Sequence, residues 1–362
     1  MTHLSQLVGQ VINLPRVINP RAERYQAACW ARPSLYLASL NSCLAVGRPI
    51  RIGVFSLLKP RKTSATVRRA SVPMRIALVL ALLGTEAPAQ PIRIGVFSLF
   101  KPHEIVLTAA GSPLEVRYGG MVSRLEGSQS IVLSGPATVG APHGGPAPFL
   151  LGIPGKIRRR FEGTLAIVPK ARYLEAIVTM DREQAVASVV AAEAFPGTPL
   201  EALKAQAVAA RSYFAAAGSS HEDYDACDST HCQFLRELPS AQSLAAQATR
   251  ATAGLLLTYQ GKPLAALYSA SCGGSTRAID APQAGYPYYP VSCDYCQHHR
   301  PGLIEGHRYG LCQRGASGMA SSGATFRAIL SHYYPGTALI GANQASLWRR
   351  TILPVSEQDL IR

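Results

Sequence analysis

The sequence predicts an α+β protein, with a β-rich N-terminal half followed by a helix pair and a mixed α/β region that together form a substrate cleft. Short β-type runs separated by Gly, Pro and Ser occupy residues 91–179. Two helical patterns follow, at 181–195 and 200–217. We therefore expect a β-rich domain at 91–179, a second region at 180–340 and a C-terminal tail at 341–362.

Composition excludes some classes of function. The chain has 362 residues, of which 48% are hydrophobic, as in a packed globular protein. Its formal charge of +15 is uneven, because residues 1–75 carry 12 Lys and Arg against one acidic residue. The remainder is only mildly basic, and its aromatic residues are not interleaved with Lys and Arg. We therefore expect no nucleic acid as a partner.

Residues 74–90 have the layout of a secretory signal peptide. Met74 and Arg75 form a short positive start, Ile76–Gly84 is apolar, and Ala87–Ala89 contains small residues suited to cleavage. The apolar run is too short to span a bilayer, so no transmembrane helix is expected, and a buried strand or helix turn is the alternative. We expect an exported protein of the periplasm or cell envelope.

An internal repeat supports this interpretation. Residues 49–60 recur at 91–102 with one difference, Leu58 against Phe100. The second copy begins directly after the expected cleavage site, as the first strand of a mature protein would. We therefore expect Met74 to be the natural start, with 1–73 a basic extension that does not fold with the rest.

The expected β-rich domain contains six strand-like runs. They are IRIGVFSLF, EIVLTAA, LEVRYGG, SIVLSG, GTLAIVP and YLEAIVTM. Residues 140–155 are rich in Gly and Pro and are expected to form a loop.

The helix pair places an acidic residue at a helix end. Residues 181–195 have an acidic first turn, Pro196-Gly197 stops the helix, and Thr198 to Glu201 reads as a capping box that opens the next helix. Glu193 falls in the last turn of the first helix, where the helix dipole disfavours a negative charge and raises the carboxyl pKa. Such a carboxyl suits a general acid that holds its proton near neutral pH.

Further elements follow the pair. Lys204 and Arg211 are seven residues apart and share one face of the second helix, either as a binding face or as a solvated charge face. Beyond them we expect a helix at 241–253, a hairpin around Gly261-Lys262 and a C-terminal helix at 317–334.

A Cys/His segment follows the second helix. His221, Cys227, His231 and Cys232 are four zinc ligands within twelve residues, enough to close a tetrahedral shell. A closed shell indicates a structural Zn²⁺ ion rather than a catalytic one. A Cys227–Cys232 disulfide is the alternative, and a zinc hydrolase using this loop is a rival function.

Four more cysteines lie downstream. Cys293 and Cys296 are able to pair with Cys272 and Cys312, either as two disulfides or as a second four-cysteine zinc site, and we favour disulfides. The Gly-rich segments 271–276 and 306–316 read as loops that line a substrate.

Four ordered motifs resemble those of the stage II sporulation protein D (SpoIID/LytB) domain. They are VVAAEAFPGTPLEALKAQAVAARSYF, DACDSTHCQ, TAGLLLTYQGKPLAALYSASCGGST and GHRYGLCQRGASGMA followed by FRAILSHYYPGT. The resemblance covers roughly residues 91–337, so the region 180–340 is expected to be the SpoIID-like catalytic region.

The resemblance implies a peptidoglycan lytic transglycosylase that cleaves glycan strands without stem peptides. It assigns the catalytic acid/base to Glu193. It assigns substrate binding to Lys204, Arg211, Tyr268, His307 and Gln313, and zinc binding to His221, Cys227, His231 and Cys232. Other members are amidase enhancers, so the alternative is a non-catalytic wall-binding partner of an N-acetylmuramoyl-L-alanine amidase.

One carboxyl group is enough for this chemistry. Glycoside hydrolysis usually uses two carboxylates, whereas a transglycosylase needs one that first protonates the glycosidic oxygen and then deprotonates the muramic acid 6-hydroxyl. The sequence departs from the family where Cys272 and Cys312 replace serines and Arg314 replaces a tyrosine. Because of these departures, the resemblance does not assign the substrate contacts around Cys272 and Cys312.

Overall fold

The computed structural model describes residues 91–216, 221–279 and 285–341. The basic extension, the candidate signal peptide and the first copy of the repeat lie outside the described residues, as does the tail beyond Gly341. The described residues belong to one compact unit.

Within the described residues, ten strands form one branched sheet. They are β1 (Pro91–Val96), β2 (Ile105–Ala109), β3 (Leu114–Tyr118), β4 (Met121–Leu125), β5 (Ser130–Leu133), β6 (Ala137–Gly140), β7 (Ala147–Ile153), β8 (Ile157–Lys170), β9 (Tyr173–Asp181) and β10 (Ala226–Cys227). The main path runs β10-β1-β9-β8-β6-β3-β4, and β7, β2 and β5 branch from β8.

The branch exists because β8 is long enough to serve two sets of neighbours. Its first half pairs with β7, and its second half pairs with β6 and β9. Gly163 stands at the change of partner, where a side chain would collide with the backbone carbonyl of Thr179. A residue without a Cβ is therefore needed at this point.

The expectation of a loop at 140–155 is wrong. Strand β7 lies within it, and its alternating side chains Phe149 and Leu151 are fully buried in the core. Most of the Gly and Pro residues that suggested a loop flank this strand, and only Pro148 and Gly152 lie within it. Strands β4 and β6 were likewise not expected, because their runs are short and partly exposed.

Six helices lie in the described residues. They are α3 (Arg182–Glu193), α4 (Leu200–Ala216), α5 (Leu244–Ala251), α6 (Asp294–His299), α7 (Gln313–Ser321) and α8 (Phe326–Tyr333). The sequence predicted α3 and α4 nearly to the residue. Asp181 is both the last residue of β9 and the N-cap of α3, so the strand-rich and helical parts join without a linker.

The capping box expected before α4 takes a different form. The Thr198 hydroxyl donates to the Phe195 carbonyl oxygen at 2.7 Å. Glu201 instead accepts from the Lys204 ammonium and from the backbone N–H of Phe326. A side chain of α4 therefore caps the start of α8, a tertiary contact that local spacing does not reveal.

The single C-terminal helix expected at 317–334 is two helices. Gly323, at φ 90°, turns the chain after α7, and the Thr325 hydroxyl oxygen accepts from the Ala328 N–H to cap α8. A left-handed glycine ends a helix readily, which explains the break.

Seven short strands complete the part of the chain that the structure describes. They are β11 (Leu255–Tyr259), β12 (Lys262–Pro263), β13 (Tyr268–Ser269), β14 (Ser271–Cys272), β15 (Ile304–Glu305), β16 (Leu311–Cys312) and β17 (Ala338–Gly341). The hairpin of β11 and β12 is confirmed, with Gln260 and Gly261 both at positive φ in its turn.

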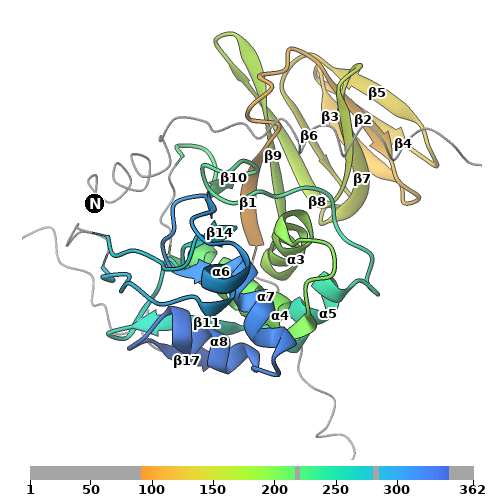
Figure 1. Ribbon diagram of the computed structural model, residues 1–362. Coiled ribbons are helices and arrows are strands. Elements are labelled where there is room, and N and C mark those ends of the chain that lie inside the picture. Colours follow the sequence, from red (N-terminus) through yellow and green to blue (C-terminus); the bar gives the residue numbers. More distant parts are fainter. Residues whose placement is uncertain (1–90, 217–220, 280–284, 342–362) are drawn as a thin grey trace, which may run out of the picture. The chain divides into compact units, whose positions relative to one another are not determined.

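The predicted α+β class is confirmed, since both strands and helices build the described residues (Figure 1). Two large hydrophobic cores organise them. The first lies between the branched sheet and one side of α3 and α4, where Val186, Val189 and Val190 are fully buried. The second lies on the other side of α4, against α7, α8 and β11. The helix pair thus connects both cores. None of the helices in the described ranges has the length and apolarity to cross a membrane.

Candidate active site and metal centre

Glu193 is the last residue of α3, at the junction between the two cores. The helix ends there because Ala194 adopts extended backbone angles and its N–H donates to the Val190 carbonyl at 3.0 Å. The Glu193 side chain is half-buried, so its carboxyl group is largely removed from water yet reachable.

The surroundings of this carboxyl raise its pKa to about 7. Burial is the largest cause, and it outweighs the lowering effects of the Phe234 N–H, the Tyr268 hydroxyl and the Arg236 guanidinium. The Phe234 N–H donates to Oε1 at 2.8 Å. The direction agrees with the sequence-based prediction, but burial rather than the helix dipole is the main cause.

Tyr268 lies beside this carboxyl group. Its hydroxyl donates to Oε1 of Gln233 at 2.8 Å, and Gln233 in turn donates to the Ala210 carbonyl at 3.1 Å. Burial and the Glu193 charge hold the pKa of Tyr268 well above its usual value. Tyr268 therefore stays neutral and acts as a hydrogen-bond donor in the site.

Gln313 and His307 come to the same place from the C-terminal motif. Gln313, at the start of α7, donates from Nε2 to the backbone carbonyl of Glu193 at 3.3 Å. The ring of His307 accepts a bond from the Tyr309 N–H at 3.0 Å and contacts the backbone of Tyr268. Burial lowers the pKa of His307 to about 4, so its ring is neutral at physiological pH.

Lys204 has a different environment from the one expected of a substrate-binding residue. Its ammonium donates to Oε1 of Glu201 at 2.6 Å and lies 6.0 Å from the ring centre of Phe326. These contacts join α4 to α8.

Arg211 is buried and connects several elements of the fold. Its guanidinium is 2% exposed and forms a bidentate ion pair with Glu183, both bonds being 2.6 Å. It also donates to the backbone carbonyls of Thr249 and Leu255. Its donors thus tie α4 to α3, α5 and β11, and Arg211 does not share a solvent-facing surface with Lys204.

Two other arginines lie closer to Glu193, and the spacing of the sequence did not single them out for this role. Arg236 acts on the Glu193 carboxylate electrostatically and stacks on Phe234, its guanidinium carbon 3.2 Å from the ring centre. Arg314 stacks on Phe195 at 3.4 Å. Both arginines stack on aromatic residues that flank the site in sequence, a pairing that only the fold reveals.

A narrow crevice, without room for a water molecule, adjoins the end of α3. Its lining residues come from the α3–α4 turn, α4, β16 and α7, and are Ala194, Phe195, Thr198, Ala202, Gln206, Leu311, Gln313 and Ala316. A larger hollow, of about 470 Å³, lies on the β-rich part around β2 and β7 and contains none of the site residues.

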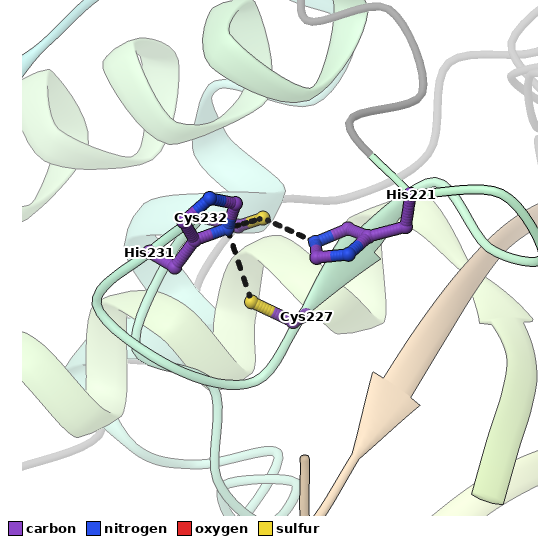
Figure 2. A group of neighbouring side chains, drawn as sticks. All are labelled: His221, Cys227, His231 and Cys232. Carbon is purple, nitrogen blue, oxygen red and sulfur yellow. Dashed lines mark hydrogen bonds between the residues drawn. The ribbon is translucent and has the colours of Figure 1, made fainter. Parts of the chain in front are cut away.

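The Cys/His loop, residues 221–234, follows α4 and leads directly to Phe234. Its four expected ligands point toward one another (Figure 2), and their ligand atoms all lie within 4.8 Å of one another. His221 Nε2 is 3.3 Å from Cys232 Sγ, and His231 Nδ1 is 3.5 Å and 3.8 Å from the sulfurs of Cys232 and Cys227.

These separations fit one tetrahedral zinc ion. With Zn–S near 2.3 Å and Zn–N near 2.0–2.1 Å, neighbouring sulfur and nitrogen ligands lie about 3.6 Å apart. The two cysteines are free thiols, so the alternative of a Cys227–Cys232 disulfide is not formed. Four protein ligands leave no position for water, and the group therefore suits a structural ion.

Part of this site lies in a segment that matches a known family model. Residues 170–259 match the family model described as SpoIID, Stage II sporulation protein. The match runs from the end of β8 to the end of β11 and includes Glu193 and the Cys/His loop, whereas Tyr268, His307 and Gln313 lie beyond it.

An uncharacterized protein of Brachyspira hyodysenteriae (strain ATCC 49526 / WA1) is 31% identical over 123 residues. The match covers 33% of this chain and 33% of that protein, so the chain spans about a third of the curated relative's length. The match identifies a SpoIID domain at residues 170–259, and the SpoIID family is linked to sporulation and the cell wall.

Proposed function

We propose that this protein is a lytic transglycosylase that cleaves peptidoglycan glycan strands, with Glu193 as its single acid/base. The observation that carries the proposal is a half-buried carboxyl group with a pKa of about 7, within the SpoIID domain. Such a group is present in comparable amounts as acid and as base near neutral pH, which suits a residue that performs both steps.

The reaction needs only this carboxyl group. The protonated Glu193 gives its proton to the glycosidic oxygen as the bond from the muramic acid C1 to that oxygen breaks. The resulting carboxylate then takes the proton of the 6-hydroxyl as the 6-oxygen bonds to C1. The products are a new free sugar end and a 1,6-anhydro ring, and Glu193 ends in its starting state.

The neighbouring residues prepare the carboxyl group for these steps. The Phe234 N–H donates to the carboxylate that forms after the first proton transfer, and the nearby Tyr268 hydroxyl helps to lower the pKa of that group. Gln313 binds the backbone carbonyl of Glu193 and fixes the end of α3. His307, held neutral, supports the backbone of Tyr268.

We propose that Arg236 and Arg314 serve the muramic lactyl carboxylate of the substrate. Both guanidinium groups stack on aromatic residues beside the end of α3. Lys204 and Arg211, which the family resemblance assigned to substrate binding, are engaged by Glu201 and Glu183. We infer that their main role is to hold the helices that carry Glu193. Denuded strands are the expected substrate, since they expose these carboxylates.

The decisive experiment measures anhydro-muramic ends released from denuded glycan by the wild type and by Glu193→Gln. Mass spectrometry identifies such ends because they lack one water relative to a reducing end. Glu237→Gln is the matched control, because Glu237 is exposed and outside the site. We expect activity in the wild type and the control, and none in Glu193→Gln. Wild-type activity in folded Glu193→Gln contradicts the proposal.

A second arm of the experiment separates this function from that of an amidase enhancer. Intact wall is incubated with a wall amidase alone, with the wild type or with the Glu193→Gln variant. An enhancer without chemistry of its own increases amidase activity equally as wild type and as variant, and it yields no anhydro ends. Loss of anhydro ends in the variant alone supports the transglycosylase.

We propose that the protein acts outside the cytoplasm, exported by the segment at 74–90 and beginning near Pro91 in its mature form. The expected cleavage site comes directly before β1, which pairs with both β9 and β10 in the sheet. N-terminal sequencing of the native exported protein tests this, and a mature start upstream of Met74 contradicts it.

A further inference from the structure

Four cysteines outside the Cys/His loop meet in the second core. Cys272 lies in β14, Cys293 is the N-cap of α6, Cys296 lies in α6, and Cys312 ends β16 and caps α7. Their ligand atoms all lie within 4.8 Å of one another, and each residue is at most 2% exposed. We call this group the four-cysteine cluster.

The cluster does not form the two disulfides that the sequence led us to favour. All four residues are free thiols. The sulfurs of Cys296 and Cys312 are 3.6 Å apart, against about 2.05 Å in a disulfide. A tetrahedral zinc ion with Zn–S near 2.3 Å holds two sulfurs about 3.8 Å apart, close to the observed separation.

The surroundings supply donors to the sulfurs, as around thiolates bound to a metal. The Gly315 N–H donates to Cys312 Sγ at 3.4 Å, and the Tyr333 hydroxyl donates to Cys293 Sγ at 3.4 Å. A side chain at residue 315 would collide with both Cys293 and Tyr333, so a glycine is needed for this close approach. Hydrogen bonds of this kind orient metal ligands and stabilise their negative charge.

We propose that the four-cysteine cluster binds a second structural zinc ion, closed by four thiolates and distinct from the ion of the Cys/His loop. Four mutually adjacent sulfurs surround a space for one ion rather than for a cluster of several. The ion ties β14, α6 and the start of α7 together. Because Gln313 directly follows Cys312, the same ion fixes the residue that contacts the Glu193 carbonyl. This proposal of a zinc site does not depend on whether the protein cleaves glycan.

The first test uses the unmodified protein. Elemental analysis should find two zinc ions per chain, and X-ray absorption at the zinc edge should find an average of three sulfur and one nitrogen ligands per ion. The Cys/His loop alone gives one zinc with two sulfurs and two nitrogens. One zinc per chain, with two sulfur and two nitrogen ligands, overturns the proposal of a second site. Iron at the second site overturns its assignment to zinc.

A thiol assay excludes disulfides independently. The exported protein is unfolded in denaturant that contains a chelator, and its thiols are alkylated without reductant. The peptides that contain the four cysteines are then examined by mass spectrometry. We expect alkyl label on all four residues. Unlabelled, disulfide-linked peptides for Cys272, Cys293, Cys296 and Cys312 overturn the proposal.

Matched variants then locate each ion. Cys296→Ser should lose one zinc of two and retain the Cys/His ion, whereas Cys227→Ser should lose one and retain the four-thiolate ion. After cobalt exchange, Cys227→Ser should show the stronger sulfur-to-cobalt charge-transfer absorption, because its remaining site has four thiolates. Two zinc ions in folded Cys296→Ser contradict the assignment. Where Cys296→Ser does not fold, the X-ray absorption spectrum of the wild type decides whether the second zinc site exists.

Discussion

The backbone N–H of Phe234 donates a hydrogen bond to Oε1 of Glu193 across 2.8 Å. Phe234 is only two residues beyond Cys232, the last cysteine of the Cys/His loop. The loop therefore delivers a donor to the acid at the end of α3. An ion that fixes the loop also fixes one of the groups that set the pKa of Glu193.

The pKa of about 7 predicts the pH dependence of glycan cleavage. Because Glu193 must be protonated in the free enzyme, kcat/KM should be constant well below pH 7 and fall about tenfold per pH unit well above it. A pH–rate profile on denuded glycan measures this fall of kcat/KM at alkaline pH. A rate that stays constant to pH 9 contradicts the assignment of Glu193 as the acid.

The same pKa shift predicts how Glu193→Gln changes stability. The folded-state pKa is raised above the ordinary value of 4.5, so the contribution of Glu193 is fully present below pH 4.5 and is lost as pH rises through about 7. The shift corresponds to about 3 kcal/mol at high pH. Urea unfolding should therefore find Glu193→Gln more stable than the wild type at pH 8, by up to that amount, and little changed at pH 4. A difference that does not vary with pH contradicts the shifted pKa, and Glu237→Gln serves as the exposed control.

The sequence was most informative where the signals are local. The acidic first turn at 181–195 and the stop at Pro196-Gly197 defined α3 and α4, and the spacing of the Cys/His loop predicted a group of ligands that the structure brings together. The position of Glu193 at a helix end was also predicted, although the burial that dominates its pKa depends on distant segments.

The remaining features depend on tertiary contacts that spacing does not encode. Lys204 and Arg211 do share a helix, but Glu201 and Glu183 determine what each one does. Arg314 lies far along the chain from Phe195, and the fold alone stacks the two side chains. The four free cysteines likewise meet only because β14, α6 and α7 pack together, so a count of cysteines did not distinguish disulfides from a metal site.

Substitutions of the two basic residues of α4 should separate structural from substrate-binding roles. Arg211→Met removes the partner of Glu183 and leaves backbone carbonyls without a donor, so we expect a loss of about 3 kcal/mol in the free energy of unfolding. Lys204→Met removes a partly exposed pair and should cost about 1 kcal/mol or less. Urea unfolding and kcat/KM are measured together. A more than tenfold loss of kcat/KM in Lys204→Met at unchanged stability would return Lys204 to the substrate site.

Disruption of the Cys/His loop should affect activity through Glu193 rather than through the metal itself. In Cys227→Ser an ion held by this loop should be lost, so that the loop no longer holds the Phe234 N–H against Oε1. Since that bond lowers the pKa of Glu193, its loss should raise the pKa and move the alkaline limb of kcat/KM to higher pH. Replacing zinc by cobalt or cadmium in the wild type should leave the profile unchanged, because a closed ion performs no chemistry. A rate that changes with the metal bound would favour a zinc hydrolase. If the alkaline decline of kcat/KM occurs at the same pH in folded Cys227→Ser as in the wild type, the loop does not control the pKa of Glu193.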